Sequence, residues 1–319
     1  MNQKVIKTSL ELLSNNSEWE ERYAKYIKYL KDKQPKRFKK PEGLSVYSSV
    51  SGYKGETYDL RFDGQSVGLV VSRPNKVLLY PRDEANEKYF GFKLEKECVD
   101  WHSPEATKFR RFFRNLANGS SDIKLKSPEH RVENCLLNEF AKQTRKEGKE
   151  LTNIQPIKLN DCFFQMPTPL GASNHNPTYA IQYGGGIDIL SRIKLKGESR
   201  ICVMEVKDEN KESESQADAM EQALSYATFI AKLLRSKSGQ LWWDFFMGRE
   251  SVYRQMPSNL NIDVVTIMPT GETEEFANKI IDVPQLDTKF HCHSLYYDNE
   301  AFAGGKFVFS GSFPKQLNQ

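Results

Sequence analysis

The chain has 319 residues, of which 38% are hydrophobic and 28% charged, and its formal net charge is +4. This length suits one large domain or two ordinary ones, and the composition indicates a soluble globular protein. No apolar run approaches 18 residues, and the N-terminus MNQKVIKTSLELL lacks an apolar signal core, so we expect no membrane span and no secretory signal.

The cysteines bear on the cellular location of the protein, and the charge distribution bears on its binding partners. Five cysteines, an odd number without a C-x-x-C motif, favour reduced thiols and a cytoplasmic location. Residues 1–126 hold 25 Lys and Arg against 17 Asp and Glu, whereas the remainder holds 21 against 25. This asymmetry fits a protein that grips a polyanion with one part and binds cations with the other, although ordinary surface scatter explains it equally well.

The first 41 residues predict helices followed by a basic loop. Between residues 4 and 31 apolar residues recur at spacings of three and four, and the SNNSEWEE segment predicts a break with Ser17 as an N-cap. Residues 31–41 then carry six basic residues and two prolines. This segment either lies along a phosphate backbone or is a solvated basic loop.

Residues 44–95 predict a small antiparallel sheet, because short runs of β-branched and aromatic residues alternate with Gly, Asn and Pro. We expect its tyrosines and phenylalanines to fill the sheet core, with base stacking as the alternative. Residues 105–117 predict an amphipathic helix that packs on the sheet and turns its arginines to nucleic acid. Its apolar face is Phe109, Phe112, Phe113 and Leu116, and its basic side is Arg110, Arg111 and Arg114.

The polar segment NGSSDIKLK (118–126) predicts a boundary between a region of residues 1–120 and a domain of residues 121–319. Ser127-Pro128 then opens a helix. On this helix Glu133 lies one turn before Leu136 and Leu137, so it faces inward, where a carboxylate requires a charged partner or a metal. Glu133 is therefore a candidate site residue, and an ion pair at the helix start is the alternative.

The central feature is a hairpin formed by residues 187–195 and 200–207, joined by a turn near Gly197. Glu205 and Lys207 share one face of the second strand, because side chains alternate along a strand. A register that pairs Asp188 with Val206, give or take a residue or two, brings Asp188 across from this segment. The sequence therefore predicts that an aspartate, a glutamate and a lysine converge.

Two carboxylates so close repel each other unless a cation joins them. Oxygen ligands select a hard ion such as Mg²⁺ or Mn²⁺, with waters and a substrate phosphate completing its shell. Lys207 would then hold the attacking water or the charged phosphoryl group. A chance occurrence of D…ExK in an ordinary α/β protein is the alternative, and it predicts that Asp188 and Glu205 lie far apart.

The spacing Ile187-Asp188 followed by Glu205-Val206-Lys207 resembles the PD-(D/E)XK nuclease superfamily. Gln222 and Tyr226 form a Q-x-x-x-Y pattern like that of its RecB-like branch, and Glu133 matches the acidic residue on its preceding helix. The resemblance covers roughly residues 125–235. It implies an α/β fold with a three-layer core, a restriction-endonuclease-like central mixed sheet flanked by helices, preceded here by an N-terminal α+β region.

The resemblance also implies an activity, a Mg²⁺- or Mn²⁺-dependent nuclease that hydrolyses phosphodiester bonds, most plausibly of DNA. Asp188, Glu205, Glu133 and the backbone carbonyl of Val206 would hold the metal. Lys207 would assist the attack of water, and Gln222 with Tyr226 would support the site or the substrate. The alternative is a nucleic-acid-binding protein that keeps this fold without cutting.

The flanking segments predict the remaining elements. The glycines at 184–186 match no nucleotide-binding motif, and His175 is a loop histidine that could touch substrate. Ser215 and Asp218 form a capping-box pattern that opens a helix over residues 216–234. A second helical region at 239–256 and strands at 261–269, 291–297 and 306–313 follow. His291 and His293 share one strand face, where zinc binding is a minor alternative.

Overall fold

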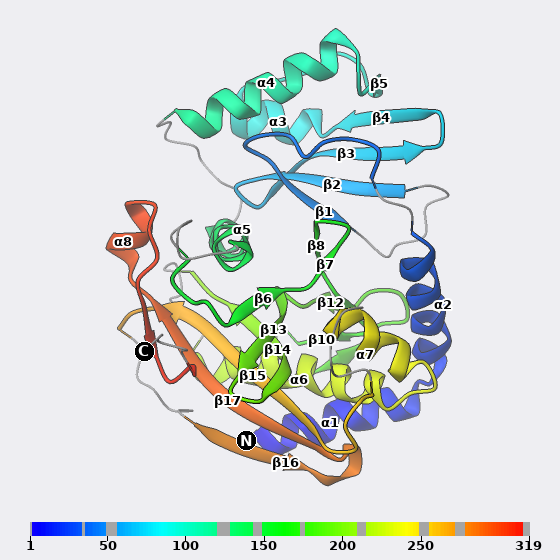
Figure 1. The fold of residues 1–319 in the computed structure, drawn as a ribbon, viewed down its shortest axis with the longest axis vertical. Helices are drawn as coiled ribbons and strands as arrows, with labels where there is room; N and C mark the ends of the chain where they lie inside the picture. The colour runs from blue at the N-terminus through cyan, green and yellow to red at the C-terminus, as the bar shows by residue number, and fades with distance from the viewer. Residues whose placement is uncertain are drawn as a thin grey trace. The chain divides into compact units, whose positions relative to one another are not determined.

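The computed structural model describes residues 2–33, 36–48, 56–119, 128–142, 149–172, 176–208, 215–248, 255–271 and 278–314. The predicted boundary segment around 120–126, His175 and most of the loop after Lys207 lie outside these ranges. The fold is mixed α/β with mixed sheets, as the sequence predicts at this coarse level (Figure 1). Among the described residues, no helix is both long enough and apolar enough to cross a bilayer.

The chain forms two compact units that interleave along the sequence. One unit, called the catalytic unit below after its predicted site, comprises residues 1–28, 137–157 and 165–319. The other, called the basic unit, comprises residues 29–136 and 158–164. A single cut at residue 120 would therefore separate residues 1–28 from the catalytic unit, and residues 121–136 and 158–164 from the basic unit.

The basic unit is built on a seven-stranded sheet in the order β5-β4-β3-β2-β1-β8-β7. Neighbours are antiparallel except β1 and β8, which pair in parallel. The strands are β1 (Ser45–Ser48), β2 (Glu56–Phe62), β3 (Gln65–Arg73), β4 (Lys76–Pro81), β5 (Val99–Asp100), β7 (Lys158–Leu159) and β8 (Cys162–Phe164). The antiparallel sheet predicted over residues 44–95 is confirmed for β1 to β4, but residues 83–90 of that range form a helix, and β1 also pairs in parallel with β8.

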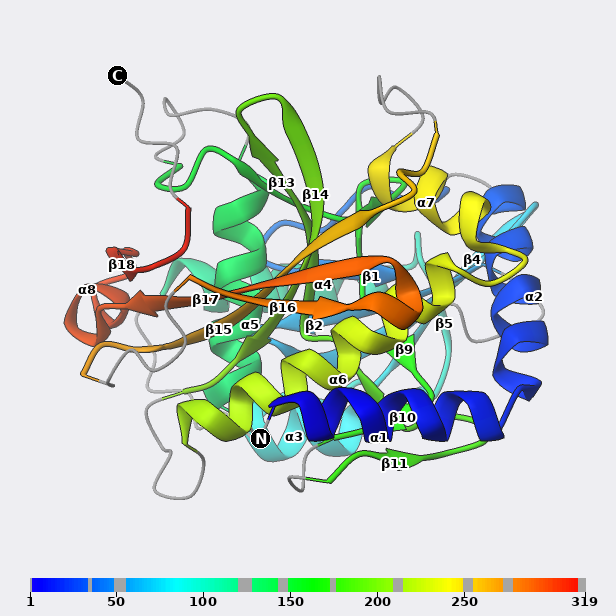
Figure 2. The same cartoon turned by 90° about the horizontal axis from the view of Figure 1, so that it is seen from below.

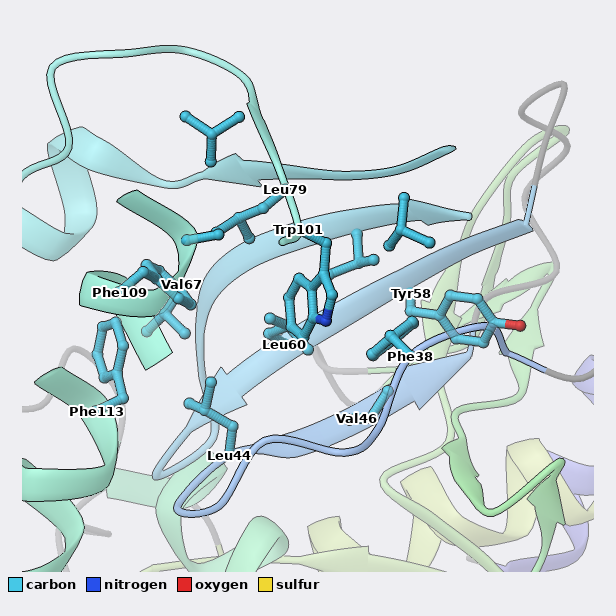
Figure 3. Packing of buried hydrophobic residues seen from close by; sticks show 14 of the residues in the cluster. Phe38, Leu44, Val46, Tyr58, Leu60, Val67, Leu79, Trp101, Phe109 and Phe113 are labelled. Atoms are coloured by element: carbon cyan, nitrogen blue, oxygen red, sulfur yellow. The ribbon is translucent and has the colours of Figure 1, made fainter. Parts of the chain in front are cut away.

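Helix α4 (Pro104–Asn118) covers this sheet and has the predicted apolar face. Phe109 and Phe113 are fully buried in one cluster with Leu60, Val67 and Leu79 of the sheet (Figure 3). Ser103 caps the helix by accepting a hydrogen bond from the Ala106 N–H, and Pro104 follows at its first position. A short helix, α3 (Asp83–Phe90), ends at Gly91, which has φ +63°.

The catalytic unit contains a mixed sheet in the order β16-β17-β15-β14-β13-β6, with β18 paired to β17. The strands β14, β15 and β17 run parallel, and the flanking strands β13, β6 and β16 are antiparallel to their neighbours. The strands are β6 (Ile154–Pro156), β13 (Ile189–Leu195), β14 (Glu198–Val206), β15 (Leu260–Pro269), β16 (Lys279–Val283), β17 (Thr288–Tyr297) and β18 (Phe309–Gly311).

Helix α6 (Gln216–Leu234) connects β14 to β15 and packs against both, and α1 (Asn2–Asn15) lies alongside α6 (Figure 2). Ser215 and Asp218 form the predicted capping box at its start. Trp19 and Tyr23 of α2 (Glu18–Asp32) pack against Phe229 of α6. The remaining elements of this unit are β9 (Pro167–Thr168), β10 (Leu170–Gly171), β11 (Thr178–Tyr179), β12 (Gly185–Gly186), α7 (Gly239–Met247), a 3-10 helix (Pro284–Leu286) and α8 (Asn299–Ala303).

Helix α5 (Pro128–Ala141) contributes residues to both units, since its first part belongs to the basic unit and its end to the catalytic unit. Phe140 at its end is buried and packs against Phe309 of β18. Leu136 and Leu137 are buried as predicted.

Candidate active site

The hairpin β13–β14 closes through Lys196 and Gly197, and Gly197 has φ +81°, a conformation that favours glycine. Ile189 pairs with Met204, one residue away from the predicted register. Continuing this register places Asp188, the residue before β13, across from Glu205. A two-residue turn fixes the register of the whole hairpin, so the position of Asp188 follows from the turn.

The carboxylate of Asp188 is fixed by the backbone of the facing strand. Its Oδ2 atom accepts a hydrogen bond of 2.9 Å from the backbone N–H of Val206. The Asp188 side chain is half-buried, whereas Glu205, Val206 and Lys207 are buried. Asp188 thus lies beside the Glu205-Val206-Lys207 segment, as the sequence predicts.

Glu205 and Lys207 form a buried ion pair. Lys207 Nζ lies 3.0 Å from Glu205 Oε1, and their side chains are 5% and 1% exposed, respectively. An ammonium taken out of water requires such a partner, because burial without compensation costs several kcal/mol. The ion pair gives each of these buried side chains an oppositely charged partner.

The Q-x-x-x-Y residues extend this cluster from α6. Gln222 Oε1 accepts a hydrogen bond of 3.4 Å from Lys207 Nζ, and its Nε2 atom donates one of 3.4 Å to the Tyr226 hydroxyl. Burial and the negative charge of Glu205 raise the pKa of Tyr226 well above its usual value. Tyr226 therefore stays a neutral phenol at physiological pH and can donate a hydrogen bond.

The backbone of the cluster is held by neighbouring strands. The Lys207 N–H donates to the Ile267 carbonyl of β15 at 2.9 Å, and the Tyr297 hydroxyl of β17 donates to the Lys207 carbonyl at 3.1 Å. Gly185 lies against Tyr226, since a Cβ atom at that position would be 2.8 Å from the tyrosine hydroxyl. These contacts position the cluster at the carboxyl end of β14.

The structure thus brings together Asp188, Glu205, Lys207, Gln222 and Tyr226, which the sequence predicts to converge. A chance D…ExK match predicts that Asp188 and Glu205 lie far apart, whereas the hairpin places Asp188 across from Glu205. Gly185 and Tyr297 contact this cluster at Tyr226 and at the Lys207 carbonyl, respectively. Sequence reasoning missed Tyr297, because a contact across 90 residues leaves no signal in a local pattern.

Glu133 is buried at 2% exposure, as predicted for an inward-facing carboxylate. Its surroundings in the basic unit include Tyr47, whose pKa is raised first by burial and then by the negative charge of Glu133. Tyr47 also donates a hydrogen bond to Asn134, the next residue on α5. The assignment of Glu133 to the metal site stays a prediction.

The donor set can be compared with the needs of a divalent cation. Asp188, Glu205 and the Val206 carbonyl offer only oxygen atoms, which suits Mg²⁺, an ion commonly held by one or two carboxylates plus waters and phosphates. Within the ranges that the structure describes, no group of three or more His, Cys, Asp or Glu side chains could hold a metal. Asp188 and Glu205 are thus the two carboxylates of the cluster whose chemistry suits Mg²⁺, and any further ligands would be waters and substrate.

The His-x-His pair on β17 has hydrogen-bond partners on β15. His291 Nε2 lies 3.0 Å from Asn261 Oδ1, and His293 Nε2 lies 3.0 Å from Asp263 Oδ1. These contacts favour a structural role for both histidines over zinc binding.

No protein-family model, curated protein or solved structure matches this chain. Functional inference therefore rests on the residues of the cluster and their geometry.

Proposed function

We propose that the protein is a metal-dependent nuclease that hydrolyses phosphodiester bonds, with DNA as the substrate we favour. The observation that supports this most is the convergence of Asp188, Glu205 and Lys207 at the end of one hairpin, joined by Gln222. A chance D…ExK match gives no reason for the two carboxylates and the lysine to meet.

The arrangement of elements supports the same proposal. Helix α5, strands β13 and β14, and helix α6 follow one another in the chain in the order of the PD-(D/E)XK core, apart from short intervening strands. The sheet that carries the cluster is mixed, and α6 packs against the two strands β14 and β15. We therefore propose a restriction-endonuclease-like core in the catalytic unit.

In this proposal Asp188, Glu205 and the Val206 carbonyl hold Mg²⁺ or Mn²⁺. When bound, the ion supplies positive charge that stabilises the developing negative charge on the phosphate and favours ionisation of water. The protein residues prepare the site for this chemistry by fixing two carboxylates and one ammonium group before substrate arrives.

Lys207 is the residue that would contact the attacking water or the phosphoryl oxygens. Its ammonium is held by Glu205 and Gln222, so its N–H groups are oriented rather than free to rotate into solvent. Gln222 in turn is fixed by Tyr226. Tyr226, kept protonated by its buried position, accepts the hydrogen bond from Gln222 and can donate its own proton to a substrate oxygen.

The test is cleavage of labelled single- and double-stranded DNA and RNA of one sequence, with Mg²⁺, Mn²⁺ or EDTA. We expect metal-dependent cleavage that falls at least about 10²-fold in Lys207→Met, the loss typical of removing one preorganised donor. Lys142→Met is the matched control, because Lys142, the residue after α5, also pairs with a glutamate, Glu139, and is more exposed than Lys207. The control should cleave like the wild type.

Metal-dependent cleavage that persists in Lys207→Met would refute the role of Lys207. No cleavage of any substrate, together with salt-sensitive binding of nucleic acid, would favour the second function, a nucleic-acid-binding protein on the same fold. The presence of all the charged residues of the motif argues for the nuclease.

A further inference from the structure

A strongly basic groove of about 610 Å³ is lined by residues of the basic unit, and none of them belongs to the proposed catalytic cluster. Six cationic side chains line it, against a single acidic one, Glu42. The cationic residues are Arg37, Lys39, Lys40, Arg110, Arg111 and Arg114.

One wall of the groove is a stripe of α4. Thr107, Arg110, Arg111 and Arg114 recur at spacings of three and four, so they share one face of the helix. Phe109 and Phe113 bury the opposite face in the sheet core. Because the core fixes the rotation of the helix, the arginines are presented on the groove side by the packing itself.

The other wall is the segment of residues 36–42, anchored by one aromatic side chain. Phe38 is buried, with its ring centroid 5.0 Å from that of Trp101 and 5.3 Å from that of Tyr58 (Figure 3). Its neighbours Arg37 and Lys39 are exposed. The anchor therefore turns basic side chains outward from a segment that has no regular secondary structure to hold them.

Two of the arginines are already fixed by the protein. Arg110 donates to the Trp101 carbonyl at 2.6 Å and lies 4.5 Å above the Trp101 ring, and Arg37 donates to the Pro74 carbonyl at 2.5 Å. Carbonyl groups orient a guanidinium without neutralising its charge. Preorganised cations lose less side-chain entropy when they meet an anion.

The positive charge of the groove lacks acidic ion-pair partners among the residues that the structure describes. None of the six cations forms an ion pair with any residue that the structure describes. Burial and the nearby ammonium groups of Lys158 and Lys36 lower the pKa of Lys40. Like charges gathered in this way destabilise the folded unit unless an anion joins them.

We propose that this groove binds the sugar–phosphate backbone of a nucleic acid strand. A groove of this volume falls in the size range of small-molecule pockets, but such pockets are lined mainly by apolar groups, and this one is lined mainly by charges. A linear polyanion satisfies several cations at once. The inference rests on the proposed function only for the identity of the polyanion, since a nuclease must hold nucleic acid.

The test is the salt dependence of binding, measured by fluorescence anisotropy of labelled single-stranded and duplex DNA in EDTA, where a metal-dependent nuclease does not cut. The groove variant is Lys39→Gln/Arg111→Gln/Arg114→Gln, three exposed side chains. The matched control is Arg82→Gln/Lys88→Gln/Lys108→Gln, three exposed cations of the same unit outside the groove. Both variants change the net charge by the same amount.

Each phosphate contact contributes about −0.7 for single strands and about −0.9 for duplex to the slope of log K against log salt. The groove variant should therefore lose about 2 from the slope on single strands, or about 3 on duplex, and bind about 10²-fold more weakly at 0.1 M salt. The control should keep the wild-type slope. The form of DNA that shows the full loss is the form that the groove holds.

Equal slope changes in the two variants, or no change in either, would overturn the proposal. The proposal would also be overturned if the protein bound phosphatidylserine vesicles but not DNA, and if the groove variant no longer bound the vesicles. The ligand of the groove would then be a membrane surface. The readout is independent of cleavage. Binding through the groove without any cleavage would refute only the nuclease proposal. Cleavage together with an unchanged slope in the groove variant would refute only the groove proposal.

Discussion

Removing the ammonium of Lys207 should destabilise the catalytic unit strongly. Lys207→Met replaces the side chain with an uncharged one that is a single atom shorter, and it leaves the buried Glu205 carboxylate without the ammonium now 3.0 Å away. Breaking a buried pair from one side costs about 3–5 kcal/mol. We expect about 3 kcal/mol, the lower end, because Asp188 and Gln222 of the same cluster are only half-buried and admit some water.

The assay is a double-mutant cycle with Lys207→Met and Glu205→Gln. The free energy of unfolding of each variant is measured by urea unfolding, with tryptophan fluorescence as the signal. In a Trp101→Phe background, the three remaining tryptophans all lie in the catalytic unit, so the signal reports that unit. Each single variant should lose stability, and the double variant should lose less than the two together. A coupling energy of about 2 kcal/mol follows, within the range found for contacting buried residues.

The control cycle uses Lys25 and Glu21, an i,i+4 pair on α2 in which both side chains are largely exposed. Water and salt screen such a pair, so its coupling should be much smaller. A Lys207–Glu205 coupling no larger than that of the control would refute the reasoning, since it would mean that the two charges are solvated.

Two further predictions concern the site's surroundings and the thiols. Gly185→Ala should lower cleavage about 10–100-fold, because its Cβ would press on the Tyr226 hydroxyl. Gly119→Ala should leave cleavage unchanged, because Gly119 has φ −106° and its Cβ would come no closer than 3.5 Å to a neighbouring atom; equal activities of the two variants would contradict this. At pH 8 iodoacetamide should alkylate the exposed Cys98 first, as peptide mass spectrometry can show. Burial raises the pKa of Cys292 to about 12, so only about 0.01% of it is thiolate at pH 8, and rapid labelling there would be the opposing result.

Local patterns predicted how the residues of the cluster are arranged, because the relations among them are mostly local. The glycine turn at 196–197 set the hairpin register to within one residue, and that register brought Asp188 to the ExK strand. Helical spacing placed Gln222 and Tyr226 side by side, and the capping box placed the start of their helix. Each of these relations spans fewer than about 20 residues.

Features that depend on distant pairing left no comparable signal. Strand β8 joins β1 in parallel across more than 100 residues, so nothing near either strand indicates the pairing. The interleaving of the two units follows from such pairings. Helix α3 is only eight residues long, too short for a convincing periodic pattern between two β segments. Strand β16 was missed as well, because its burial comes from pairing with β17.

The hydrogen bond from Tyr297 to the Lys207 carbonyl also sets an order of events during protein synthesis. The carbonyl cannot receive this bond until the ribosome has added 90 more residues. At 5–20 residues per second, that interval lasts about 5–18 s. Strand β15 and then β17 must emerge and pair before the end of β14 is anchored, so the nascent chain carries its carboxylates and lysine well before their final support exists.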